Sequence, residues 1–163
     1  MASAEELARG QREILGFAGR YSYDLGITAG GGIQEGLARW LLLAAEIGVG
    51  AGYDKTSALG LRTQTSIFTI DTNAHFVFPR KKYSNFTPYA LAGVSVFNIR
   101  SAFSVKGQHI MKTSDSIGGF NWGVGSRLAL GKTWGLRPEA RVSRVEGTHV
   151  LRITVAIYKR IKP

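Results

Sequence analysis

The sequence predicts an all-β fold: an eight-stranded antiparallel up-and-down β-barrel that spans a membrane and has a polar lumen filled by side chains. Three observations lead to this prediction. Apolar and polar residues alternate in segment after segment, which is the period of β-strands. Glycine accounts for 21 of the 163 residues, and there are 3 Trp, 6 Tyr and 8 Phe. The polar face of the strands combines small residues with charges of both signs, which suits a crowded interior better than a solvated surface.

The clearest alternation is a predicted hairpin over residues 119–141, with a turn at residues 131–133. One face of this hairpin is apolar and aromatic, and the other carries glycine, amide and charged groups. The apolar face comprises Phe120, Trp122, Val124, Ser126, Leu128, Leu136 and Ala140, and the polar face comprises Gly119, Asn121, Gly123, Gly125, Arg127, Arg137, Glu139 and Arg141. Because opposite charges on the polar face could pair, we expect this face to turn inward and the apolar face to meet lipid.

The remaining strands show the same pattern. We expect them over residues 13–23, 28–37, 40–53, 65–78, 87–105 and 149–161, with a polar loop at residues 54–64. Leucine and alanine in residues 40–53 would also suit a helix, but the alternate glycines that follow favour a strand. Each segment reaches the roughly 9 to 11 residues that cross a bilayer. Aromatic residues near the strand ends predict interfacial girdles, namely Tyr21, Tyr23, Trp40, Tyr53, Phe78, Tyr89, Trp134 and Tyr158.

Turning the polar face inward predicts which side chains fill the lumen. The predicted polar network comprises Arg20, Glu46, Asp71, Asn73, His75, Asn121, Arg127, Arg137, Glu139, Arg141 and Arg152. The predicted lipid-facing residues are Phe68, Ile70, Phe76, Phe120, Trp122, Val124, Leu151, Ile153, Val155 and Ile157. Five arginines and three carboxylates nearly balance, and eight strands enclose a space that side chains just fill. We therefore expect hydrogen-bonded ion pairs and no open channel.

The ends of the chain and its charge indicate where it works. Residues 1–12 are predicted to be a flexible polar tail and residues 13–163 the barrel. The start lacks the basic and apolar stretch of a secretion signal, so we interpret the chain as a mature protein without its signal peptide. A formal charge of +10 predicts an anionic partner. Because the basic residues are scattered, we expect a monomer that contacts membrane lipid or lipopolysaccharide, and no nucleic acid.

Three segments resemble the small bacterial outer-membrane β-barrel domain proteins, the OmpA/OmpX-like group. They are PYALAGVSV at residues 88–96, GFNWGVGSRLALGKTWGLRPEARV at residues 119–142 and HVLRITVAI at residues 149–157. The resemblance extends from about residue 13 to the end of the chain and implies a place in the bacterial outer membrane. The outer connections of this chain look short, which predicts little surface for adhesion or ligand capture.

The main functional hypothesis is an outer-membrane protein of structural or interaction type with a plugged lumen. The alternatives are a soluble β-barrel that binds a small ligand or nucleic acid, a narrow ion pore, and a lipid-modifying barrel enzyme. His75 could be catalytic, but it shares a face with Asp71 and Asn73, which favours a place in the polar network. No histidine and serine stand at a spacing that would assemble a nucleophile and base, so we predict no catalytic residue, and also no cofactor and no metal site.

Overall fold

The computed structural model describes residues 9–22, 25–52, 55–56, 61–78, 85–105 and 108–161. The regular structure in these ranges is β-strand, in eight long strands and one short one. They are β1 (Arg12–Tyr21), β2 (Ile27–Ala38), β3 (Leu41–Ala51), β4 (Lys55–Thr56), β5 (Leu61–Val77), β6 (Phe86–Val105), β7 (Gln108–Ala129), β8 (Trp134–Val145) and β9 (Thr148–Ile161). Within the described ranges, no helix is long and apolar enough to cross a membrane.

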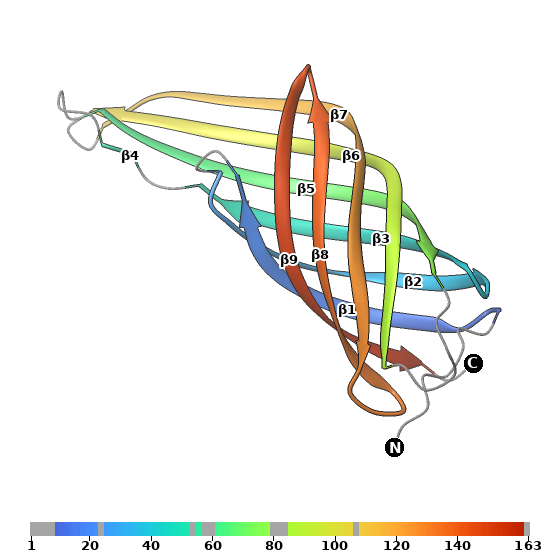
Figure 1. Cartoon of the computed structure of the whole chain (residues 1–163). Helices are drawn as coiled ribbons and strands as arrows, with labels where there is room; N and C mark the ends of the chain where they lie inside the picture. The colour runs from blue at the N-terminus through green and yellow to red at the C-terminus, as the bar shows by residue number, and fades with distance from the viewer. Residues whose placement is uncertain are drawn as a thin grey trace.

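The eight long strands close into an antiparallel barrel (Figure 1). Each long strand pairs with the next long strand along the chain, and the two-residue β4 pairs only with β5. The first and last strands pair with each other, Arg12 lying opposite Ile161, and this pairing completes the ring. The predicted eight-stranded up-and-down barrel is therefore confirmed.

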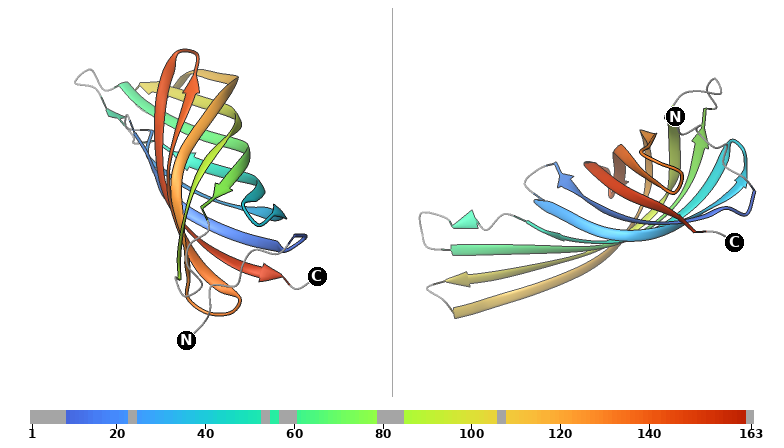
Figure 2. Two further views of the ribbon diagram at one scale, coloured as in Figure 1. Left: turned by 45° about the vertical axis from the view of Figure 1, so that its right-hand side comes forward. Right: turned by 90° about the horizontal axis from the view of Figure 1, so that it is seen from below.

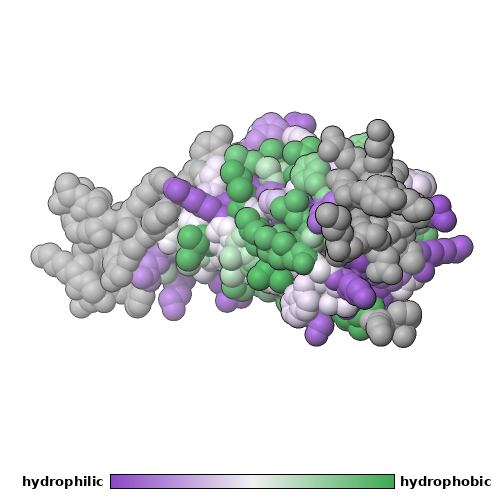
Figure 3. All heavy atoms as spheres, turned by 60° about the horizontal axis from the view of Figure 1, so that its bottom comes forward, coloured by the Kyte–Doolittle hydropathy of each residue, from purple (hydrophilic) through white to green (hydrophobic). Residues whose placement is uncertain are grey.

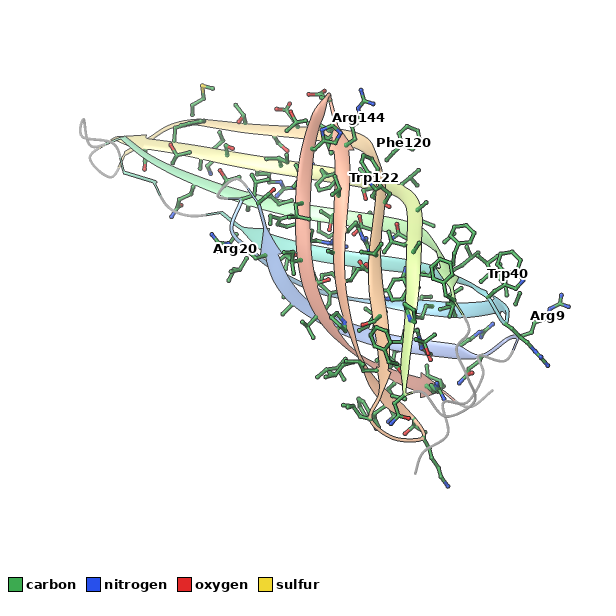
Figure 4. The ribbon with its side chains drawn as sticks, viewed as in Figure 1. Arg9, Arg20, Trp40, Phe120, Trp122 and Arg144 are labelled. Atoms are coloured by element: carbon green, nitrogen blue, oxygen red, sulfur yellow. The ribbon has the colours of Figure 1, made fainter. Side chains whose placement is uncertain are left out.

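The two ends of the barrel differ in what they carry. The described chain enters at Arg12 and finishes at Ile161 on the same side, and we call this the terminal end and the opposite side the distal end. Figure 4 shows Trp40 toward the terminal end, with Arg20 and Arg144 toward the distal end. The connections β1–β2, β3–β5, β6–β7 and β8–β9 all lie at the distal end because the strands alternate in direction.

Strands β5, β6 and β7 continue beyond the barrel at the distal end. The pairing of β5 with β3 stops at Ser66, and the pairing of β7 with β8 starts at Gly119. Residues 61–65, 101–105 and 108–118 therefore form a projecting extension of the barrel sheet, which we call the distal sheet (Figure 2). The expectation of short outer connections is wrong for β6–β7, because β7 begins 11 residues before its first contact with β8. It is correct for β8–β9, which only residues 146–147 connect. The predicted loop at residues 54–64 likewise contains β4 and the start of β5.

The interior of the barrel is layered and is not polar throughout. An apolar cluster of Tyr21, Ile67, Phe97 and Val145 closes the distal end of the lumen. Two further apolar clusters lie within the barrel, one formed by Leu42, Val77, Tyr89 and Leu91 and the other by Leu15, Phe17, Ala156 and Tyr158. These clusters alternate with charged groups along the lumen, because Arg152 packs on the Phe17 ring, and Glu13 and Arg127 lie toward the terminal ends of β1 and β7.

The predicted aromatic girdle is correct only in part. Trp40, Phe78 and Trp134 are exposed on the outside of the barrel. Tyr21, Tyr89 and Tyr158 are instead buried inside, because they lie on the inward-pointing face of their strands. Tyr23 and Tyr53 of the predicted girdle, and residues 1–8 of the predicted tail, lie outside the described residues.

Candidate functional site

The outer surface carries a belt of apolar side chains. The structure exposes all ten of the predicted lipid-facing residues, from Leu151 at 37% to Phe120 at 71% of the residue's reference area. Hydrophobic residues gather across the middle of the face drawn in Figure 3, with hydrophilic residues toward its margins. Phe120 and Trp122 project from β7 close to Arg144 of β8 (Figure 4). A protein in water would bury such residues, so this belt indicates contact with lipid.

Arg20 is the one residue of the predicted network that the structure places outside. Its side chain is exposed, and its cross-strand neighbours Ile27 and Ile153 are exposed on the same face. The strand β1 therefore turns Leu15, Phe17 and Tyr21 inward and keeps Gly16, Ala18 and Arg20 outward. The aromatic side chains of β1 fill the lumen, and Arg20 lies at the distal edge of the apolar belt.

Glu46 is the hub of the buried network. Its carboxylate forms ion pairs with three arginines, one on β9 and two on β8. Arg137 contacts Oε1, whereas Arg141 and Arg152 lie 2.9 and 3.3 Å from Oε2. Strand β3 thus reaches the opposite wall of the barrel through one side chain.

Two further carboxylates hold the same arginines from other directions. Asp71 of β5 accepts from Arg152 at 2.8 Å and lies 3.2 Å from Arg141. Glu139 lies 2.6 Å from Arg141 and accepts a hydrogen bond of 2.7 Å from the Tyr89 hydroxyl. Because each guanidinium meets more than one carboxylate, the network fixes its members in both position and orientation.

A second cluster surrounds Glu13, which the sequence analysis missed. Glu13 is 1% exposed and lies 2.6 Å from Arg127 and 3.3 Å from Arg160. Gln34 donates to Glu13 and accepts from Arg137 at 3.1 Å, so it connects this cluster to the hub. The signal was available: Glu13 continues the inward alternation of Leu15 and Phe17 by one step.

Because Arg20 lies outside the lumen and Glu13 lies inside it, the charge of the lumen differs from the predicted charge. The buried charged residues are Glu13, Glu46, Asp71, Glu139, Arg127, Arg137, Arg141 and Arg152. Four carboxylates meet these four guanidinium groups and that of Arg160, whose side chain is 11% exposed and lies 3.3 Å from Glu13. The predicted surplus of two positive charges is therefore reduced to one among the described lumen residues. Near balance suits a closed, water-poor interior, because each unpaired charge would cost several kcal/mol.

The neutral polar residues of the predicted network lie in the lumen in two kinds of environment. Asn121 donates to Ser95, and Ser95 donates to Asp71. Asn73 lies beside Asn121. When its amide oxygen faces Arg141, this oxygen accepts a hydrogen bond of 3.0 Å from Nη1 of Arg141. His75 is fully buried, yet neither ring nitrogen has a hydrogen-bond partner. Its ring instead stacks on Tyr89 at 4.8 Å between centroids, so His75 occupies the lumen without joining the hydrogen-bond network.

The arrangement suits a structural plug. Its arginines and carboxylates neutralise one another, and aromatic rings cover the remaining faces: Arg127 lies 4.4 Å from the Tyr158 ring and Arg152 lies 5.2 Å from the Phe17 ring. In the described ranges, no group of three or more metal-binding side chains converges.

The sequence matches the outer membrane protein beta-barrel domain family over residues 9–155. The chain belongs to this family. The matched range covers every long strand from β1 to most of β9. No match is found among curated proteins.

Solved structures of the same fold come from several bacteria. The N-terminal β-barrel domain of Pseudomonas aeruginosa OprF is 17% identical, with a TM-score of 0.67 over 94% of this chain and 98% of that one. A major outer membrane protein from Thermus thermophilus is 12% identical, with a TM-score of 0.73 over 94% and 100%. Yersinia pestis Ail, in complex with the heparin analogue sucrose octasulfate, is 14% identical, with a TM-score of 0.64 over 94% and 100%. These similarities show that this chain shares its fold with outer-membrane barrels of several bacteria.

Proposed function

We propose that this protein is a monomeric, non-conducting barrel of the bacterial outer membrane, of structural or interaction type. The apolar belt faces the acyl chains, the buried network plugs the lumen, and the distal sheet supplies a surface beyond the bilayer. The proposal assigns the barrel no catalytic step. One observation carries it: the ion pairs of Glu46 with Arg137, Arg141 and Arg152 connect opposite walls of the lumen.

Membership of an outer-membrane barrel family supports the location. The interaction role is supported by the length of the distal sheet, since β5, β6 and β7 have 17, 20 and 22 residues, well beyond the roughly 9 to 11 that cross a bilayer. Yersinia pestis Ail was crystallised with a sulfated ligand. By analogy, an anionic partner at the distal side fits the charge of +10 of this chain.

Electrophoresis and circular dichroism of the purified chain, with and without detergent, test the membrane assignment. We expect a β-rich spectrum only with detergent or lipid, and a compact band that shifts on boiling. Size-exclusion chromatography in detergent should give one chain per micelle. A monodisperse, β-rich protein in plain buffer would contradict the proposal, because the apolar belt would then have to be a core.

Recordings in a planar lipid bilayer test the plug. The intact barrel should insert without producing discrete current steps. Reproducible steps whose size changes in the Glu46→Gln variant would establish a pore through the network and overturn the plugged lumen. Steps that do not change would indicate a current path elsewhere, which also contradicts a non-conducting barrel.

A further inference from the structure

Two neighbouring grooves lie on the outer surface where the distal sheet leaves the barrel. The first, the belt groove, has a volume of about 570 Å³ and is lined by Phe68, Ile70 and Val96 of the apolar belt. The second, the distal groove, has a volume of about 530 Å³ and is lined by Arg100, Lys112 and hydroxyl-bearing residues together with Ala51 and Ala102. Ser66 and Arg100 line both grooves. The groove that carries the large apolar side chains therefore continues directly into the one that carries both Arg100 and Lys112.

Two cations stand together in the distal groove. Arg100 pairs with Ser114 across β6 and β7, and Lys112 pairs with Ala102. Arg100 and Lys112 are therefore diagonal neighbours on the same face of the sheet, roughly 7–8 Å apart at the backbone. Both side chains are exposed and line the groove. Among the described residues, no carboxylate forms an ion pair with either, so the groove carries two uncompensated positive charges.

The guanidinium of Arg100 is held in place from one side. Its Nε donates to Oδ1 of Asn98 at 3.1 Å, and Nδ2 of Asn98 donates to Ser116 at 2.8 Å. The two terminal nitrogens of Arg100 have no partner in the described part of the chain. A guanidinium fixed at Nε presents these nitrogens as a fork that matches two oxygens of a phosphate. Ser66 and Ser114, which pair with Arg100 and lie on its face of the sheet, line the same groove and add hydroxyl donors.

We propose that the two grooves together bind one lipid molecule whose head group carries a phosphate. The acyl chain lies in the belt groove along Phe68, Ile70 and Val96, and the phosphate lies between Arg100 and Lys112. This inference rests on the proposed membrane orientation, which puts the belt groove among acyl chains and the distal groove at head-group depth. An apolar groove alone would accept any chain, and two cations alone would accept any anion. Their continuity at Ser66 and Arg100 selects an amphiphile.

Native mass spectrometry of the barrel, released from an uncharged detergent, tests the site. The probes are dioleoyl phosphatidic acid and dioleoylglycerol, which share their acyl chains and differ in the phosphate. We expect phosphatidic acid to be retained one per barrel and dioleoylglycerol to be lost. The double variant Arg100→Gln/Lys112→Gln should bind phosphatidic acid roughly tenfold more weakly or worse, as expected when hydrogen bonds to a charged group are removed.

The matched control is the double variant Arg20→Gln/Arg144→Gln. It removes the same charge from the distal edge of the belt, at two exposed residues outside both grooves, and should bind phosphatidic acid within about twofold of the parent. An equal loss in both double variants would show unspecific attraction and overturn the site. Binding of glycerol 3-phosphate or sucrose octasulfate as tightly as phosphatidic acid would show a soluble-anion site and would also overturn it.

The compact, heat-shifted band in detergent is recorded first for every variant. If the band is present and phosphatidic acid is not retained by the parent barrel, the lipid site is wrong and the proposed function stands. If the parent chain shows no such band and is monodisperse in plain buffer, the proposed function fails and the lipid site fails with it.

Discussion

Nη2 of Arg141 lies 2.9 Å from Oε2 of Glu46, although the two residues are 95 positions apart in the chain. Glu46 is on β3 and Arg141 is on β8, and β2, β1 and β9 separate these strands in the sheet. The contact therefore crosses the lumen and joins opposite walls. Both side chains are 1% exposed, so the pair is removed from water and each partner depends on the other for compensation.

Replacing Glu46 with glutamine should destabilise the barrel strongly. The variant keeps the size of the side chain but leaves Arg137, Arg141 and Arg152 with one carboxylate fewer. Removing one partner of a buried ion pair costs about 3–5 kcal/mol. The temperature at which the compact band converts to the unfolded band in detergent should fall clearly.

The matched control is Glu35→Gln. Glu35 pairs with Arg12 at 3.1 Å, but the two side chains are 44% and 71% exposed. An exposed pair contributes about 0–1 kcal/mol, so this variant should unfold close to the parent. Equal effects of the two substitutions would contradict the enclosed network.

Tyr89 and His75 stack on each other but should respond in opposite ways to the loss of their polar atoms. Tyr89→Phe removes the hydroxyl that donates to Glu139, and a buried acceptor that loses its partner costs about 1–3 kcal/mol. His75→Phe removes two ring nitrogens that have no partner, so stability should be retained or rise. Thermal unfolding in detergent measures both. If His75→Phe lowered the unfolding temperature as much as Tyr89→Phe, the His75 ring nitrogens would have to form hydrogen bonds, which would contradict the structure.

Gly125 and Gly118 lie on the same strand, β7, in very different surroundings. A Cβ at Gly125 would lie 2.8 Å from the Pro138 carbonyl oxygen and would overlap the ring of Tyr89, whereas a Cβ at Gly118 meets nothing within 4 Å. Overpacking of a filled interior costs about 1–3 kcal/mol. Gly125→Ala should therefore lower the unfolding temperature, and Gly118→Ala should not. Similar behaviour of the two variants would contradict the packing of Tyr89 against β7.

Two outward positions on β9 test the depth of the apolar belt. Val155→Arg puts a charge within the belt, one outward position further in than Ile153, the partner of Arg20. A lipid-facing arginine there costs about 2–4 kcal/mol, whereas near the interface the cost falls to about 0–1 kcal/mol. His149, exposed on the same face near the start of β9, is the matched position, so His149→Arg should fold normally. The yield of folded barrel in lipid vesicles gives the answer. Equal yields would mean that β9 does not face lipid at Val155.

The alternation of the sequence was sufficient to predict the barrel and its outward belt. Phe120, Trp122 and Val124 alternate with small or polar residues on β7. The charged residues of β7 and β8 come together only if the polar face of β7 turns inward. Strand β1 lacks this contrast, because both of its faces are mostly uncharged between Glu13 and Arg20. The alternation groups Glu13 with Leu15 and Phe17 and sets Arg20 on the other face. Which of these faces turns inward depends on the pairing of β1 with β2 and β9.

Contacts between distant strands account for the rest of what the sequence analysis missed. Glu13 meets Arg127 across 114 positions, and no spacing in the sequence indicates that pair. The distal sheet was missed because Ser114, Asp115 and Ser116 read as a polar connection, although their backbone continues the ladder with β6. Both outward and inward side chains are hydrated beyond the bilayer, so strand residues there lose the apolar signature.

Quenching of tryptophan fluorescence by lipids with brominated acyl chains tests the central claim most directly. All three tryptophans of the chain, Trp40, Trp122 and Trp134, are exposed on the outside, and Trp122 lies within the apolar belt. In vesicles of brominated lipid, the variant Trp40→Phe/Trp134→Phe, which keeps only Trp122, should be strongly quenched and should be protected from aqueous iodide. Trp122 fluorescence that iodide quenches and brominated lipid does not would contradict a lipid-facing belt.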